Sequence, residues 1–370
     1  MKIGRKTHKS TLKDIAGEAK VSPTTVSIVL KDKETRRVST ATRKRIIEIA
    51  QRFNYRPNYA ARALVTRESR SIGLVITTLE NPFYSEIAQD IIVRAKETGY
   101  GVIASSVRGG IDDERRSVYD LVDRGVDGLI ICSALRHDPL ISDLIEQGIP
   151  FVLTLRGVHQ NLGEPPVDYI GVNNERGGYL AVEHLLKMGH KRIGLLSGDL
   201  KTSTGYDRHM GAMAAFEALG MQPSSDLILN GDFRRNTGFR LTLELIKREG
   251  RPTAIFAHND HMAIGVLEAL REKGLRVPED IAVVGFDDIE MAGLPGVDLT
   301  TVAPKKATMG RMAVDTLLEK IKVPSINQLV KRIILDPVLI IRKSCGFSSR
   351  GGRLKGSLGA EGRADGRPQR

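Results

Sequence analysis

From Ser71 onward, short apolar runs rich in β-branched residues alternate with longer stretches of helical period. The runs fall into two series, at 71–78, 100–106, 126–132 and 149–155, and then at 191–198, 226–232, 252–259 and 280–288. Alternation of this kind indicates an α/β fold of parallel, doubly wound sheets with helices on both faces. The two series open alike, with SIGLVITT and RIGLLSGD, so we expect two similar lobes rather than one long sheet.

The first segment has a different, all-α pattern. STLKDIAGEAKVSPTTVSIVL, residues 10–30, predicts two short helices joined by a tight turn. Thr11 and Asp14 have the spacing of a capping box, and Ser22 can cap the second helix with Pro23 in its first position. Ser39 can cap a third helix through Phe53. Together these features predict a helix-turn-helix, whose second helix enters a major groove; a small three-helix cap is the alternative.

The charge of the chain supports a nucleic-acid partner. Residues 1–71 carry 18 Lys and Arg against 6 Asp and Glu, whereas residues 72–343 carry 32 against 36. A compact basic module on a near-neutral body favours double-stranded DNA, because neutralising phosphates supplies most of the non-specific affinity. A basic, solvated surface with no nucleic-acid role is the alternative. The absence of an apolar run long enough to span a membrane, and of an apolar leader, leads us to expect a cytoplasmic protein without a membrane partner.

Individual side chains of the second predicted helix have different expected roles on DNA. Ser22, Thr25 and Ser27 are short hydroxyl donors suited to phosphate oxygens. Thr24 can hydrogen-bond a base edge, and Ile28 can contact a thymine methyl group. The outward face is completed by Pro23. After this unit, Pro57 ends the third helix, and Asn58 can cap a further short helix, from Tyr59 to Leu64, that is too short to be stable alone.

The stretches TLKDIAGEAKVSPTTVS, VSTATRKRIIEIAQRFNYRPNYAARAL and SIGLVITTLENPFYSEI resemble the lactose-repressor/galactose-repressor (LacI/GalR) family of bacterial transcription regulators, from about Thr11 to Arg342. The resemblance implies a body like that of periplasmic sugar-binding proteins and a homodimer on a pseudo-palindromic operator. It also implies that Leu64 of each subunit wedges into the minor groove, where an apolar side chain unstacks a base step. The resemblance implies base-reading polar or basic residues at the positions of Pro23, Thr24 and Ile28. Here only Thr24 can hydrogen-bond a base edge, so the operator sequence is not readable by analogy.

Polar and aromatic side chains follow the predicted strand ends, where ligands bind in parallel sheets. The resemblance implies that a small-molecule effector contacts Phe83, Arg156, Arg208, Phe233, Asn259 and Asp287. We expect a sugar or a sugar derivative. Leu155 stands where many sugar-responsive members have an aspartate, and the chain lacks the tryptophan of the purine-binding members, so the effector itself stays open.

The expected domains are a helix-turn-helix at 1–55, a hinge helix and linker at 56–70, an effector-binding core at 71–343 and a disordered basic tail at 344–370. Within the core, we assign 71–168 and 303–328 to the first lobe, and 169–302 and 329–343 to the second.

The sequence contains no GxxxxGK, GxGxxG, HExxH or GxSxG, and neither Cys132 nor Cys345 has metal-ligand spacing. We therefore expect no enzyme activity, cofactor or metal. A solute-binding protein and a sugar-processing enzyme remain as the alternative functions to an effector-controlled regulator, most simply a repressor.

Overall fold

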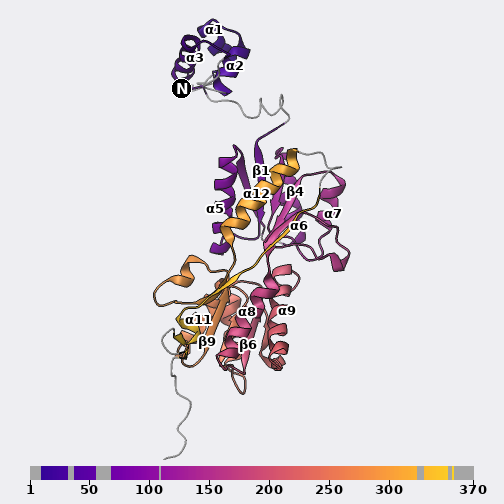
Figure 1. The fold of residues 1–370 in the computed structure, drawn as a ribbon, viewed down its shortest axis with the longest axis vertical. Coiled ribbons are helices and arrows are strands. Elements are labelled where there is room, and N and C mark those ends of the chain that lie inside the picture. The colour runs from indigo at the N-terminus through magenta and orange to yellow at the C-terminus, as the bar shows by residue number, and fades with distance from the viewer. Residues whose placement is uncertain are drawn as a thin grey trace, which may run out of the picture. The chain divides into compact units, whose positions relative to one another are not determined.

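The computed structural model describes residues 10–31, 37–55, 68–107, 110–322, 329–348 and 352–353. The chain forms two compact units, Met1–Ser69 and Arg70–Arg370. Figure 1 shows the ribbon of both units with their elements labelled.

The first unit is the expected three-helix arrangement, with α1 (Leu12–Ala19), α2 (Pro23–Lys31) and α3 (Thr40–Arg52). The predicted capping box is confirmed: Asp14 N donates to Thr11 Oγ1, and Thr11 N donates to Asp14 Oδ2. Lys20 ends α1 in the left-handed conformation. The small core of the unit consists of side chains from all three helices, namely Ile15, Ala16, Ala19, Val26, Val29, Ile46, Ile49 and Ala50.

The second unit contains two six-stranded sheets, one in each lobe (Figure 1). The first sheet is parallel throughout and has the order β11-β5-β4-β3-β1-β2. Its strands are β1 (Ser71–Ile76), β2 (Gly101–Ser106), β3 (Gly128–Ile131), β4 (Phe151–Thr154), β5 (Tyr169–Val172) and β11 (Arg332–Leu335). The two-lobed, doubly wound fold predicted from the sequence is therefore confirmed.

The second sheet repeats this order as β12-β10-β9-β8-β6-β7, with β12 antiparallel to β10. Its strands are β6 (Ile193–Ser197), β7 (Ile228–Asn230), β8 (Ala254–Ala257), β9 (Ala282–Phe286), β10 (Thr300–Ala303) and β12 (Val338–Ile340). In each sheet the second strand in chain order pairs with one side of the first strand, and the third strand pairs with its other side. The carboxyl ends of the strands at such a reversal form a crevice that commonly binds ligands.

Helices cover both faces of the first sheet. Leu74 of β1 faces the cluster that contains side chains of α5 (Pro82–Glu97) and α12 (Lys306–Lys322). The next residue, Val75, faces the cluster formed with α6 (Ile111–Asp123) and α7 (Pro139–Glu146). Neighbouring residues of a strand point to opposite faces, so the two helix pairs lie on opposite sides of the sheet. Figure 1 shows α12 beside α5.

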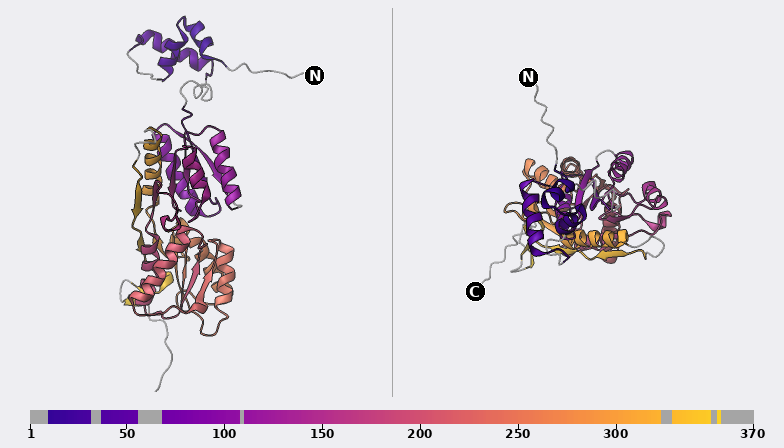
Figure 2. Two further views of the ribbon diagram at one scale, coloured as in Figure 1. Left: turned by 90° about the vertical axis from the view of Figure 1, so that its right-hand side faces the viewer. Right: turned by 90° about the horizontal axis from the view of Figure 1, so that it is seen from above.

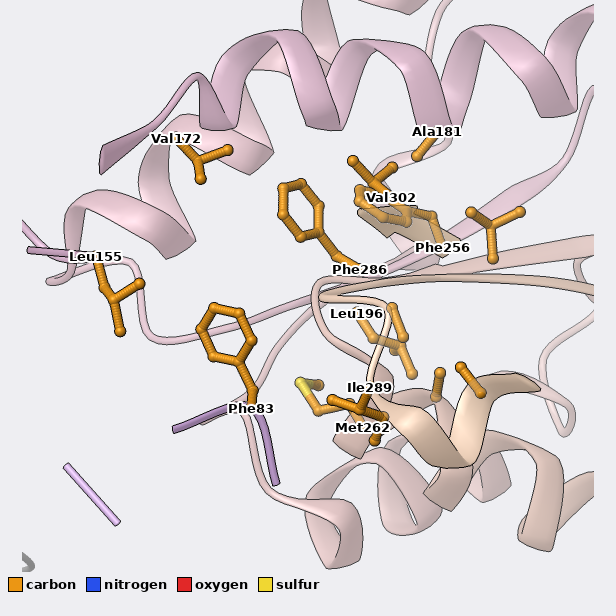
Figure 3. Close-up of a cluster of buried hydrophobic side chains, with 14 of the residues drawn as sticks. Phe83, Leu155, Val172, Ala181, Leu196, Phe256, Met262, Phe286, Ile289 and Val302 are labelled. Carbon is orange, nitrogen blue, oxygen red and sulfur yellow. The ribbon is translucent and has the colours of Figure 1, made fainter. Parts of the chain in front are cut away.

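The second sheet carries α8 (Asn174–Lys187) with α9 (Ser203–Ala218), and α10 (Arg235–Leu245) with α11 (Asp260–Glu272). Short 3-10 turns occur at Gln160–Leu162, Ser225–Leu227, Glu290–Gly293 and Lys343–Cys345. The largest hydrophobic cluster continues from the first lobe into the second. Figure 3 shows part of it, with Phe83 and Leu155 near one end and Phe256 farther into the second lobe.

The chain crosses between the lobes after β5, after β10 and after β11. Figure 2 shows the two lobes from a second direction, with the C-terminal chain running from one to the other. The expected lobe boundaries at 168/169 and 328/329 are wrong at these crossings, because β5 and β11 pair with each other in the first sheet. The run RIILDPVLII reads as one strand, but Pro337 has no N–H for a sheet ladder, so the run divides into β11 and β12.

The expected disordered tail also begins too early. Ser344 and Cys345 are buried, and Ser344 Oγ donates to Val283 O at 2.6 Å while accepting from Thr300 N at 2.8 Å. A further short ladder joins β13 (Phe347–Ser348) to β14 (Gly352–Arg353). Small polar side chains can be buried when hydrogen bonds satisfy them, which composition does not reveal. The remainder of the tail lies outside the described residues.

Candidate DNA-binding helix and ligand cavity

The second helix of the first unit, α2, presents the predicted polar face. Ser22, Pro23, Thr24 and Ser27 are exposed, and Thr25 and Ile28 are half-buried. Ser22 caps the helix as expected, since its Oγ accepts from Thr25 N at 3.1 Å. The Ser22 and Thr25 hydroxyl oxygens also lie 2.9 Å apart. Asn58 and Leu64, the expected hinge contacts, lie outside the described residues.

All six predicted effector residues of the second unit line one narrow cavity, whose free interior of about 10 Å³ has room for about one water molecule. The first lobe contributes Asn81, Phe83, Tyr84, Leu155 and Arg156, and the second contributes Thr204, Arg208, Phe233, Asn259 and Asp287. The cavity therefore lies between the lobes, at the carboxyl ends of strands from both sheets. The structure shows that these residues converge, whereas their contact with an effector stays a prediction.

Arg208 is the most completely enclosed cation of the cavity, with 4% of its surface exposed. Its Nε donates to Asn174 Oδ1 at 2.9 Å, and its Nη1 donates to His258 O. Its Cζ lies 3.5 Å from the centroid of the Phe286 ring. These contacts fix the guanidinium with its remaining N–H groups available toward the cavity.

Close helix packing places Arg208 at this depth. A Cβ atom added at Gly178 of α8 would lie 2.1 Å from Arg208 O, and one added at Gly211 would lie 1.9 Å from Glu175 O. Because any larger residue would clash with backbone atoms, these two glycines allow α8 and α9 to pack closely.

Asp287, which follows β9, is the only carboxylate among the described residues that line the cavity. Its Oδ1 lies 3.3 Å from Arg208 Nη2 but has no hydrogen-bond partner. Burial raises the pKa of Asp287 to about 6, and the nearby Arg208 charge acts in the opposite direction. Burial lowers the pKa of Arg208, because in both groups burial disfavours the charged form. The pair thus keeps an unfilled acceptor in the cavity.

Arg156, on the first-lobe side, is held differently. Its Nη2 donates to Tyr84 Oη at 3.3 Å, and its Cζ lies 5.6 Å from the centroid of the Phe233 ring. Its Nε is buried and has no hydrogen-bond partner. Among the described residues, no ion pair joins Arg156 to a carboxylate.

Three residues that line the cavity have a strained backbone. Leu155, Phe233 and Asp287 have φ angles of 65°, 69° and 114°. Non-glycine residues adopt this region rarely, and the surrounding structure must stabilise it. Strain of this kind is common where side chains are aimed at ligands.

The roles of Asn259 and Asp260 differ from the sequence interpretation. The sequence predicts an effector contact for Asn259, and the aspartate that follows it could equally cap the helix that begins there. Instead Asn259 is the N-cap, accepting from Met262 N at 2.8 Å, while its Nδ2 donates to Phe233 O at 3.2 Å. Asp260 accepts from Thr301 Oγ1 at 2.6 Å and Ile289 N at 3.0 Å. Asn259 still lines the cavity, with its amide already engaged.

Sequence reasoning missed Thr204 and Asn174. Thr204 lies four residues before Arg208 on α9, so helical spacing would have placed both on one face. Asn174 follows β5, a four-residue strand that the run pattern did not reveal.

A second group of contacts joins the lobes outside the cavity. Arg136 of the first lobe donates its backbone N–H to Lys201 O at 2.9 Å, and its guanidinium lies 3.5 Å from the Tyr206 ring centroid. Arg136 Nε also donates to His159 Nδ1 at 3.3 Å, and His159 Nε2 lies 3.3 Å from Asp207 Oδ1. We call this set, Arg136, His159, Lys201, Tyr206 and Asp207, the lobe clasp.

A larger cleft, of about 380 Å³ and partly open to solvent, lies beside the crossover strands. It is lined by residues such as His159, Asn173 and Arg332, and none of the predicted site residues. Among the described side chains, none of the buried polar atoms without a partner belongs to this cleft, whereas Arg156 Nε and Asp287 Oδ1 belong to the smaller cavity. The smaller cavity is therefore the better candidate.

A basic helix-turn-helix unit and a two-lobed α/β unit with a cavity between its lobes define a transcription regulator. Residues 11–58 match the lacI family of bacterial regulatory proteins, and residues 182–345 match a periplasmic binding protein-like domain. The HTH-type transcriptional repressor PurR of Haemophilus influenzae (strain PittEE) is 36% identical over 340 residues, covering 90% of this chain and 98% of the relative. The chain belongs to the lacI family.

Solved structures agree. The lac repressor dimer bound to operator and the anti-inducer ONPF is 32% identical, with a TM-score of 0.78 over 91% of this chain and 99% of that chain. The transcriptional regulator CelR–cellobiose complex is also 32% identical, with a TM-score of 0.68 over 91% of this chain and 100% of that chain. Among the described residues, no helix is long and apolar enough to cross a membrane.

Proposed function

We propose that this regulator is a repressor that binds a pseudo-palindromic operator as a homodimer and is controlled by a small molecule in the cavity between the lobes. We infer that the effector is a sugar or a sugar derivative. Convergence of the six predicted effector residues on one cavity carries this proposal. Relatives named as repressors and a neighbour solved with cellobiose support it.

The cavity has the chemistry that a polyhydroxylated ligand requires. Asp287 Oδ1 is an acceptor without a hydrogen-bond partner, and Arg156 Nε is a donor without one. Phe83 and Phe233 provide apolar faces on which a ring can rest. Few, well-placed polar groups among apolar walls are typical of small-molecule sites.

On the DNA side, we propose that Thr24 contacts a base edge and Ile28 a thymine methyl, with Ser22, Thr25 and Ser27 on phosphates and Pro23 beside them. Exposure of the polar face of α2 supports this assignment. We also propose that Asn58 and Leu64 act at the operator centre. A protein with these contacts acts where the operator lies, in the cytoplasm.

Control by the effector follows from a two-state equilibrium of the body. A ligand held by side chains of both lobes binds a closed arrangement better than an open one, so it shifts the population toward the closed state. If the two states differ in operator affinity, ligand and operator affinities are linked. The difference in ligand affinity between the states sets the size of the effect.

The repressor names of the relatives favour the regulator over a solute-binding protein or a sugar-processing enzyme. The test is a thermal-shift screen of sugars and sugar derivatives on the full chain, followed by operator titrations with each compound that binds. Operator DNA is selected from genomic fragments. The proposal predicts at least one compound that both raises the melting temperature and changes operator affinity. A full chain that selects no DNA sequence would contradict it.

A further inference from the structure

We propose that the effector carries a single carboxylate, as a polyhydroxy acid does, and that Arg156 binds that carboxylate. This inference rests on the proposed function, because it assumes that the effector occupies the cavity between the lobes.

The charge of the cavity is the first argument. Its charged lining residues are Arg156, Arg208 and Asp287. Arg208 and Asp287 lie 3.3 Å apart and compensate each other. Arg156 has no such partner among the described residues, so the lining keeps one positive charge. A cation held partly out of water without a counter-ion is costly, and an anionic ligand removes that cost.

The geometry of Arg156 is the second argument. The Nε–H and one Nη2–H of a guanidinium form a side-on pair of donors that matches the two oxygens of a carboxylate. Nη2 has two protons, of which one bonds to Tyr84 Oη, and Nε has no partner. The protein thus leaves Nε without an acceptor, and because Nε is enclosed in this arrangement, a ligand reaches the side-on pair only when the lobes move apart. Phe233, 5.6 Å from Cζ, lies beside the guanidinium and limits its movement.

The neighbouring carboxyl group, Glu114, does not cancel this charge. Its side chain is 4% exposed and accepts a hydrogen bond from Ser133 Oγ rather than from Arg156. Burial raises the pKa of Glu114 to about 7, with Asp138 acting in the same direction and Ser133 and Arg156 in the opposite one. Near neutral pH this group is therefore only partly ionised, and it is already engaged by Ser133.

A carboxylate fits the cavity better than a phosphate. Phosphates commonly use backbone N–H groups at helix N-termini, and here those nearest the cavity are engaged. Phe83 N donates to Asn81 Oδ1, Met262 N donates to Asn259 Oδ1 and Gly205 N donates to Thr202 Oγ1. The single uncompensated charge also matches a monoanion. Asp287 Oδ1 is left to accept from a ligand hydroxyl, which points to a hydroxy acid.

The experiment compares acids with their uncharged counterparts on the full chain. The probes are gluconate with glucitol, glucuronate with glucose and galacturonate with galactose, with glucose 6-phosphate as the phosphate. Binding is measured by thermal shift and calorimetry for wild type, Arg156→Gln and Arg156→Lys. Arg116→Gln is the matched control, because Arg116 is exposed on α6 and lies outside the cavity.

We expect an acid to bind and its neutral counterpart to bind at least tenfold more weakly. Arg156→Gln should weaken the acid about 10- to 100-fold, the range of a lost charge-assisted hydrogen bond. The affinity of Arg156→Lys for the acid should lie between those of wild type and Arg156→Gln, and the affinity of Arg116→Gln should match that of wild type. A cooperative unfolding transition with a midpoint close to that of wild type shows that each variant is folded.

Three results would overturn the proposal: a neutral compound that binds as tightly as its acid, full acid affinity in Arg156→Gln, or no binding by any acid. Tighter binding of glucose 6-phosphate than of every carboxylate would show that the preferred anion is a phosphate and would also overturn the proposal. An acid that binds through Arg156 but leaves operator affinity unchanged would instead contradict the proposed function and leave the carboxylate assignment standing.

Discussion

The guanidinium of Arg208 lies over the ring of Phe286, with Cζ 3.5 Å from the ring centroid, and the next residue along the chain, Asp287, forms the ion pair with the same arginine. Two consecutive residues at the end of β9 thus hold Arg208: Phe286 contacts it with its ring, and Asp287 pairs with its charge. A side chain fixed in this way loses little conformational freedom when a ligand arrives, which favours affinity.

Replacing Asp287 by Asn should remove most of the effector response and leave operator binding without effector intact. The substitution neutralises the only cavity carboxylate and leaves the Arg208 charge buried without its partner, which costs about 3 kcal/mol of stability. Calorimetry with the acid that binds wild type should show that Asp287→Asn binds it at least tenfold more weakly. Undiminished ligand affinity would mean that Asp287 is not a ligand contact.

Glu114→Gln should remove a pH dependence of stability. Burial raises the pKa of Glu114 from 4.5 to about 7. Between these values the native state keeps a proton that the unfolded chain releases, so the free energy of unfolding falls as pH rises from 4.5 to 7. Glutamine has no such proton, and at pH 8 the variant should be more stable than wild type by up to roughly 3 kcal/mol.

Urea unfolding of both proteins at pH 5 and pH 8 measures this difference. Asp112→Asn, an exposed change in the same helical turn, is the control. It should leave the free energy of unfolding unchanged at both pH 5 and pH 8. If wild type and Glu114→Gln show the same pH dependence, Glu114 is ionised in the native state at neutral pH.

The lobe clasp should help to stabilise the closed arrangement that binds ligand. Arg136→Gln removes the contact of the guanidinium with the Tyr206 ring, worth about 1 kcal/mol in a partly desolvated site. Ligand affinity should fall about three- to tenfold, because closing the lobes then costs more. A double-mutant cycle with Tyr206→Leu tests the pair directly. Strictly additive losses in ligand affinity would show that the two residues do not act together.

Two threonines of α2 should separate base recognition from phosphate binding. Thr24→Ala should relax base preference more than it lowers general affinity, because Thr24 is exposed and is the base-edge candidate. Thr25→Ala should weaken binding to all sequences about equally, since its hydroxyl lies beside that of Ser22 at the helix N-terminus. A binding-site selection with both variants reads out the two effects. The reverse pattern would mean that the other face of α2 meets the bases.

Local sequence patterns were sufficient for most of the fold. Alternating strand and helix runs predicted the two lobes, and cap residues such as Thr11 and Ser22 predicted the first unit, because both signals depend on neighbours in the chain. The candidate ligand residues at strand ends converge on one cavity for the same reason: the carboxyl ends of parallel strands meet at one edge.

The features that the sequence did not predict depend on distant partners. β5 belongs to the first lobe because it pairs with β4, and β11 joins the same sheet by pairing with β5 across 163 positions, as Arg332 does with Tyr169. The buried position of Asp260 depends on its hydrogen bond from Thr301, and the burial of Ser344 depends on Val283. No local pattern specifies these contacts.

The central claim is that ligand in the cavity and operator on the first unit are thermodynamically coupled. The most direct measurement determines four dissociation constants on the full chain: operator with and without the bound carboxylate, and the carboxylate with and without operator. The account predicts that both affinities change by the same factor, about 5- to 150-fold for a typical coupling of 1–3 kcal/mol. Tight carboxylate binding with operator affinity unchanged would contradict it.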